Sequence, residues 1–92
     1  MIDTFDLIDL LVVFGNLAEC KNYDTVSKKM HKSKRTIKNY IHLLEEYYNT
    51  ILIYNTKTIE LTEKGREVYE IYKQICPVLD EIMKKVNEFK NN

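Results

Sequence analysis

The sequence predicts a mainly α-helical fold with one small β-hairpin, and three observations lead to this prediction. Only two glycines and one proline occur among 92 residues, so few tight turns are expected. Apolar residues recur at helical spacing through most of the chain, and this period changes only after residue 49. A hydrophobic content of 45% with 30% charged residues is typical of a globular chain, and this length suffices for one small core.

The first three helices are expected over residues 4–20, 23–30 and 33–48. In the first, apolar residues on one face recur three or four positions apart: Leu7, Leu11, Phe14, Leu17 and Ala18. Asn22 and Ser33 are suited to cap the next two helices, because their side chains accept a free backbone N–H. The three residues 31–33 join these two helices, and a short helix closely joined to a longer one is the helix-turn-helix unit.

A hairpin and a long helix are expected to follow. Two short β-prone runs, Ile51–Tyr54 and Thr58–Leu61, flank residues 55–57. Thr62 is suited to cap a helix that extends towards Lys90. A hairpin directly after the helix-turn-helix unit makes it winged. We therefore predict a winged helix-turn-helix over residues 1–61 and, in the same single domain, a linker and dimerisation helix over residues 62–92.

Charge is distributed unevenly although the formal net charge is zero. Residues 1–20 contain four acids and no Lys or Arg, whereas residues 21–44 contain seven bases and one acid, Asp24. The remaining residues, 45–92, carry a net charge of −2. A basic block of this kind suits a polyanion, and acidic flanks would discourage binding elsewhere on the surface.

Several functional classes find no support in the sequence. Cys20 and Cys76 lie far apart without metal-like spacing, which favours reduced thiols in a cytoplasmic protein, with a disulfide as the alternative. His31 and His42 have no Cys or acidic partner at ligand spacing. No nucleophile–base pair or phosphate loop is evident, and no apolar run approaches the ~20 residues of a membrane span. We expect no enzyme activity, no metal, no cofactor and no membrane partner.

The outward face of the third helix carries the candidate DNA-binding residues. A basic helix face is usually only solvated surface, but its position between a three-residue turn and a hairpin favours recognition. For base contacts we expect Lys34, Arg35, Thr36, Lys38 and Asn39, with the planar fork of Arg35 suited to guanine. For the phosphate backbone and the wing we expect Lys28, Lys29, Lys32, Ser33, Tyr40, His42 and Lys57. Tyr40 and His42 are expected to be exposed by their position.

The C-terminal helix carries an apolar repeat with alternating spacings of four and three: Val68, Tyr72, Ile75, Leu79, Ile82, Val86 and Phe89. A seam of this length exceeds what a small domain can cover, so a second copy is the expected partner, in an antiparallel or crossed homodimer. Pro77 conflicts with a continuous helix, because it cannot donate to the carbonyl of Lys73. Either a kink at Pro77 or a second helical segment beginning there is expected.

From Leu11 through Leu61 the chain resembles the N-terminal DNA-binding domain of LysR-type transcriptional regulators. Asn22-Tyr23 stands where that family usually has Ser-Phe, and Met30-His31-Lys32-Ser33 is similar to its Leu-His-x-Ser. Ile37, Ile41 and the pair Leu44-Glu45 match further positions, and residues 61–65, LTEKG, are close to Leu-Thr-x-x-Gly. The resemblance implies a homodimeric regulator that binds double-stranded DNA.

Three departures accompany this resemblance. The family's Ser-Gln-Pro-Ala-Val-Ser reads here as the cationic SKRTIK of residues 33–38, and Asn55 stands where the wing usually has Arg. The ligand-sensing domain of such regulators does not follow within the 92 residues, so we expect either a natural single-domain protein or a fragment. A separate partner protein could take that domain's place. The alternative function is a winged-helix interaction module whose basic face binds an acidic protein.

Overall fold

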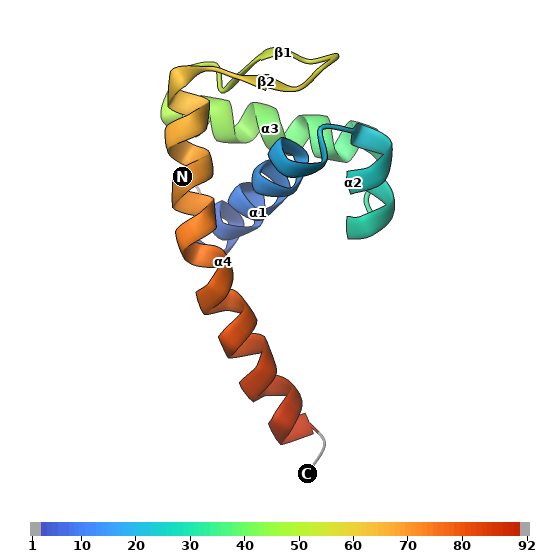
Figure 1. The fold of residues 1–92 in the computed structure, drawn as a ribbon, viewed down its shortest axis with the longest axis vertical. Helices are drawn as coiled ribbons and strands as arrows, with labels where there is room; N and C mark the ends of the chain where they lie inside the picture. Colours follow the sequence, from blue (N-terminus) through green and yellow to red (C-terminus); the bar gives the residue numbers. More distant parts are fainter. Residues whose placement is uncertain (1–2, 91–92) are drawn as a thin grey trace.

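The structure, a computed structural model, describes residues 3–90. It contains four helices and a two-stranded sheet: α1 (Thr4–Cys20), α2 (Tyr23–Met30), α3 (Lys34–Tyr48), β1 (Ile53–Asn55), β2 (Glu60–Leu61) and α4 (Glu63–Lys90). Figure 1 shows the hairpin at one end of the molecule and α4 extending well beyond the other elements. The predicted fold, a winged helix-turn-helix followed by a long helix, is confirmed.

The helices begin where the capping side chains predict. Asn22 Oδ1 accepts the N–H of Thr25 at 3.1 Å, and Ser33 Oγ accepts the N–H of Thr36 at 3.1 Å. Thr62 Oγ1 accepts the N–H of Gly65 at 3.0 Å at the start of α4. Each of these bonds satisfies a donor that the first helical turn leaves unpaired, so the sequence encodes these boundaries locally.

The two strands are shorter than predicted, because Leu52 and Ile59 at their ends do not join the ladder. β1 and β2 pair antiparallel, with Ile53 opposite Leu61. Leu52 lies outside the ladder: its N–H donates to Glu45 Oε2 at 2.8 Å, and its carbonyl accepts the N–H of Thr62 at 2.9 Å. At the other end Ile59 adopts a left-handed conformation, with φ of 54°, which ends the pairing and turns its side chain into the core. This conformation is unusual for a β-branched residue.

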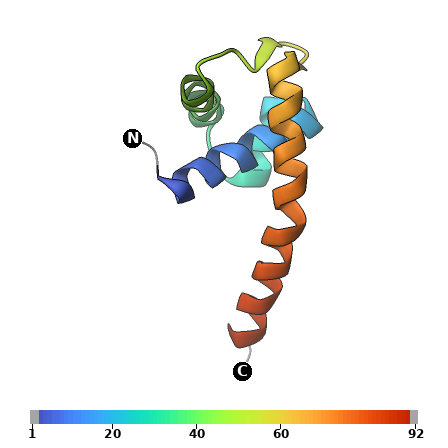
Figure 2. The same cartoon turned by 90° about the vertical axis from the view of Figure 1, so that its left-hand side faces the viewer.

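The core is built around α1, which contacts α2, α3 and α4. Figure 2 shows α1 crossing close to α4 at one end and projecting away from it at the other. The fully buried residues come from every helix and from the hairpin segment: Val13, Phe14, Leu17, Val26, Ile37, Leu44, Leu52, Ile59 and Val68. Tyr23 and Met30 are half-buried against this core, as expected for the inner face of α2.

The apolar repeat of α4 divides into two parts, and this corrects part of the predicted dimerisation seam. Val68 and Tyr72 are buried within the domain itself, because α1 covers them, and Ile75 and Leu79 are half-buried. The remaining members of the repeat, Ile82, Val86 and Phe89, are exposed. The first half of the seam is therefore core, and only the second half is free to meet another chain.

α4 continues through Pro77 as one helix, so the alternative of a second segment starting there is wrong. Figure 1 shows α4 changing direction near its middle, which fits the loss of a backbone donor inside a helix. No helix within residues 3–90 has the length and apolar composition to cross a membrane.

Candidate nucleic-acid interface

The connection between α2 and α3 is fixed by local bonds. His31 adopts a left-handed conformation with φ of 56°, which ends α2. The N–H of Lys32 then donates to the carbonyl of Ser27 at 3.1 Å, and the hydroxyl of Ser27 donates to the carbonyl of Lys32. Ser33 caps the helix that follows. The entry of α3 is thus held at a defined angle to α2, as a recognition helix requires.

α3 has one buried face and one cationic face. Ile37, Ile41 and Leu44 are buried against the core. The opposite side exposes four of the five residues predicted for base contacts: Lys34, Arg35, Lys38 and Asn39. The fifth, Thr36, is half-buried, and its hydroxyl oxygen accepts the hydroxyl of Ser33 at 2.9 Å. The structure thus brings the predicted base-contacting residues together on the first two turns of α3.

Two lysines of this face are held by residues at the start of α2. The ammonium of Lys34 lies 2.8 Å from the carboxylate of Asp24. Hydrogen bonding to this ammonium, together with its charge, lowers the pKa of Asp24 below the ordinary range. The ammonium of Lys38 lies 5.3 Å from the ring centroid of Tyr23, within range of a cation–π contact. Asp24 was not among the site residues predicted from the sequence, although it is the single acid among residues 21–44.

The residues predicted for the phosphate backbone surround this face. Lys28, Lys29 and Ser33 are exposed, whereas Lys32 is half-buried, with its ammonium 5.3 Å from the ring centroid of Tyr40. The expectation that Tyr40 is exposed is wrong, because its ring packs against the core between α1 and α3. The same expectation for His42 is confirmed.

The wing presents one cation at its tip, Lys57, which is exposed. Asn55 Oδ1 accepts the N–H groups of Lys57 at 3.0 Å and of Thr58 at 3.3 Å. This side-chain-to-backbone turn gives a structural role to the asparagine that stands in place of the expected arginine. Lys57 is therefore displayed on an ordered turn.

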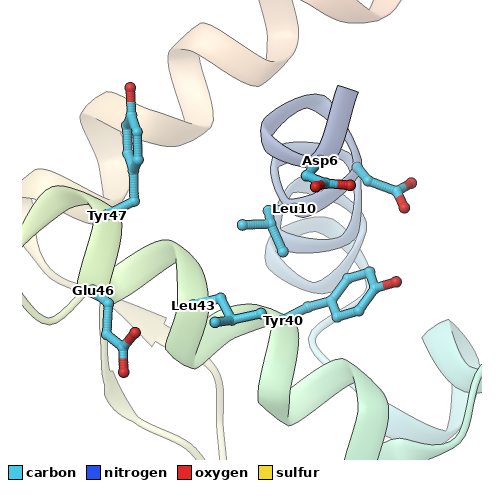
Figure 3. Close-up of a pocket in the computed structure, with 7 residues that line it drawn as sticks. Asp6, Leu10, Tyr40, Leu43, Glu46 and Tyr47 are labelled. Carbon is cyan, nitrogen blue, oxygen red and sulfur yellow. The ribbon is translucent and has the colours of Figure 1, made fainter. Parts of the chain in front are cut away.

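A groove between α1 and α3 has the opposite electrostatic character. Figure 3 shows Leu10 and Leu43 facing each other across it, with Tyr40 and Tyr47 at its sides. Carboxylates line its edge: Asp6, Asp9 and Glu46. These charges would repel a phosphate backbone, whereas the basic surface of α2 and α3 would attract one.

No cluster of three or more His, Cys, Asp or Glu residues in the described part of the chain could hold a metal ion. Cys20 and Cys76 are free thiols, both half-buried. The Cys76 thiol instead lies 3.8 Å from the hydroxyl of Tyr72, one turn away on α4.

Comparison with known families agrees with this geometry. The model of the bacterial regulatory helix-turn-helix proteins of the lysR family matches residues 8–66, which run from α1 through the hairpin into the first turn of α4. No curated protein matches the chain closely enough to be compared with it. The match covers more than half of the 92 residues and includes the whole α2–turn–α3 unit. The chain therefore belongs to the LysR family of bacterial regulatory helix-turn-helix proteins.

Proposed function

We propose that this protein is a transcriptional regulator that recognises specific sequences in double-stranded DNA as a homodimer, with α3 in the major groove. The observation that carries the proposal is the cationic first two turns of α3, exposed directly after a capped, closely held turn. In helix-turn-helix proteins this end of the recognition helix lies nearest the bases. The membership of a DNA-binding regulatory family supports the same function.

Distinct contacts follow from the side chains on this surface. Arg35 is the best base reader, because its guanidinium can donate two parallel hydrogen bonds to guanine. Asn39 is suited to adenine, and Thr36, whose hydroxyl oxygen already accepts from Ser33, offers its methyl group to thymine. Four lysines can bind phosphates on either side of α3 and at the wing: Lys28, Lys29, Lys32 and Lys57.

The homodimer is proposed from the distal half of α4. Val78, Ile82, Met83, Val86 and Phe89 are exposed there, with 81% of the Phe89 surface accessible. A contiguous apolar surface of this kind favours association. An antiparallel pairing of two such helices would bury both strips and present two α3 helices to one duplex. Such a dimer requires a two-fold symmetric site whose halves lie about one DNA turn apart, or a multiple of it.

The test is selection from a randomised duplex pool, followed by affinity measurements for the enriched site across salt concentration. The wild-type protein is compared with a triple variant, Lys34→Ala, Arg35→Ala and Lys38→Ala. We expect a two-fold symmetric motif with the wild type and its loss with the variant. A circular-dichroism melt confirms that the variant is folded, which is expected because all three side chains are exposed.

Two features favour the interaction-module alternative: the formal net charge of zero and the thin wing, whose tip carries the cation Lys57. Salt dependence separates the two functions. Phosphate contacts release counterions, so DNA affinity should fall steeply as salt rises. Weak binding to every duplex, unaffected by the three substitutions, would contradict sequence-specific recognition and leave the interaction module.

A further inference from the structure

An acidic residue lies within the surface that is proposed to bind a polyanion. Asp24 of α2 contacts the ammonium of Lys34, the first residue of α3, at 2.8 Å. Both side chains remain accessible, with exposures of 66% for Asp24 and 56% for Lys34. The lysine lowers the pKa of Asp24, so the carboxylate is charged at neutral pH. The pair therefore presents an accessible donor next to an accessible acceptor.

Stability does not account for this pair. Ion pairs between exposed side chains contribute little to folding, because water and salt screen them. Phosphate binding does not account for it either. A phosphate that approached the Lys34 ammonium would also approach the Asp24 carboxylate, and the two negative charges would repel each other. Among the cations of α3, Lys34 is therefore poorly suited to clamp the DNA backbone.

The edge of a base pair, in contrast, matches the pair. In the major groove, guanine presents two acceptors, N7 and O6, and its cytosine partner presents an N4 amino donor beside O6. The O6 and N4 atoms are joined by a Watson–Crick hydrogen bond of about 2.9 Å, the usual N–H···O length. The Lys34–Asp24 distance of 2.8 Å is nearly the same. Two parallel hydrogen bonds can therefore form, one to each base.

We propose that Lys34 and Asp24 act together as a specificity-determining pair that reads one G·C base pair in each half-site. Lys34 donates to guanine O6 and N7 with the two protons that Asp24 does not occupy, and Asp24 accepts from cytosine N4. This inference rests on the proposed function, because it requires α3 in the major groove. It assigns a base-reading role to α2, through Asp24.

The pair also defines which base pairs it rejects. A reversed C·G pair places an amino donor at the lysine and an acceptor at the carboxylate, so both contacts are lost. An A·T pair with adenine in place of guanine also puts an amino donor, N6, at the lysine and an acceptor, thymine O4, at the carboxylate. A T·A pair keeps one acceptor for Lys34 but puts the thymine methyl group where guanine N7 would be. The expected order of preference is therefore G·C first, T·A second, and the other two last.

The experiment measures affinities for the enriched site and for versions in which each G·C pair of the half-site is replaced in turn. At one pair, reversal to C·G should weaken wild-type binding by roughly 5- to 150-fold, the range of a good two-bond base contact. Replacement of the same guanine by inosine should change affinity by less than about twofold, because inosine keeps the O6 and N7 acceptors.

Asp24→Ala should weaken this discrimination several-fold, because the contact to cytosine N4 is lost and Lys34 is no longer held beside the base pair. It should also strengthen binding to random duplex several-fold, since Lys34 becomes free for a phosphate. For the same reason, the slope of log affinity against log salt concentration should become steeper by about one unit. Asp24→Asn keeps an acceptor oxygen without the charge, so it should retain part of the preference while showing the steeper slope.

The matched control is Glu70→Gln, which breaks an equivalent exposed pair with Lys73 at 2.9 Å on α4. It changes the net charge equally and should leave base preference unchanged. Specific binding by Asp24→Ala with the wild-type preference at every pair would overturn the inference and leave the proposed function standing. Failure of the wild type to select any motif would overturn both.

Discussion

The two halves of α4 carry the same apolar repeat in different surroundings. In the half next to the hairpin, Val68 is fully buried and Tyr72 nearly so, because α1 lies across them. In the distal half Val86 and Phe89 follow the same spacing but are exposed, as Figures 1 and 2 show for the part of the helix that projects from the domain. One repeat thus has two different environments: its first part belongs to the core, and its last part is exposed.

The comparison teaches that periodicity specifies a face of a helix and not what covers that face. Both halves satisfy the criteria for a dimerisation seam when read as sequence. Only the position of α1, which α4 reaches after the hairpin, decides that the first half is already occupied. The following substitutions test the core half and the exposed half of α4 separately.

The largest effect is expected where the repeat is core. Val68→Asp places a charge among fully buried apolar side chains, with no partner to compensate it, and should lower the free energy of unfolding by more than about 4 kcal/mol. Chemical denaturation followed by circular dichroism measures this loss. A folded Val68→Asp protein with near wild-type stability would contradict the assignment of this half to the core.

The same chemical change in the distal half should affect association instead of the stability of the domain. The double variant Ile82→Asp with Val86→Asp introduces two exposed charges into the proposed interface. Sedimentation equilibrium should show the dimer dissociation constant raised by about two orders of magnitude or more, which corresponds to roughly 3 kcal/mol. The melting profile of the isolated domain should change little.

A matched control is Asp80→Asn with Glu81→Gln, two exposed substitutions on the same part of α4 that lie outside the apolar repeat. These should preserve the dimer. If the Ile82 and Val86 variant still dimerises like the wild type, another surface holds the two copies together.

An intermediate effect is expected where α1 crosses α4. A Cβ atom at Gly15 would overlap the ring of Tyr72, so the two helices approach closely only because this position lacks a side chain. Gly15→Ala should destabilise the domain by about 1–3 kcal/mol through overpacking. The compensating variant Gly15→Ala with Tyr72→Leu should recover part of this loss in the same denaturation assay. An unchanged Gly15→Ala protein would show that α4 can move away from α1 without cost.

Much of the fold could be predicted because its signals are local. The caps formed by Asn22, Ser33 and Thr62 depend on residues three positions away, and the helix faces depend on a period of about 3.6. The predicted ends of the strands were less accurate, because Leu52 bonds to Glu45 of α3, a contact that no local pattern reveals. Tyr40 was expected to be exposed for the same reason, since its half-burial depends on packing against the core.

The candidate site divides in the same way. The exposure of Lys34, Arg35 and Lys38 follows from the buried positions between them and could be predicted. The pairing of Lys34 with Asp24 could not, because it joins two helices whose relative orientation depends on the turn between them. The only signal in the sequence was one acid, Asp24, inside a strongly basic segment.

The smallest effect concerns the polar contacts between α1 and the core half of α4. The hydroxyls of Tyr69 and Tyr72 donate to the carboxylate of Glu19 at 3.2 and 3.4 Å. Burial is the main cause that raises the pKa of Tyr72, followed by its contact with Cys76 and the charge of Glu19. A raised folded-state pKa means that its contribution to stability is complete below the unfolded-state value of about 10 and is lost as the pH rises above it.

Urea denaturation should therefore show the free energy of unfolding falling as the pH rises above about 10, with a share of about 1 kcal/mol from Tyr72 by about pH 10.5. Tyr72→Phe should remove this share and flatten the pH dependence. Tyr54→Phe is the matched control, because Tyr54 is exposed on the hairpin and its removal should leave the slope unchanged. Equal slopes in the wild type and Tyr72→Phe would mean that the ring is ionised as easily in the folded domain as in the unfolded chain. The junction between α1 and α4 would then open readily to water, and the core half of α4 would be held by Val68 and its apolar neighbours alone.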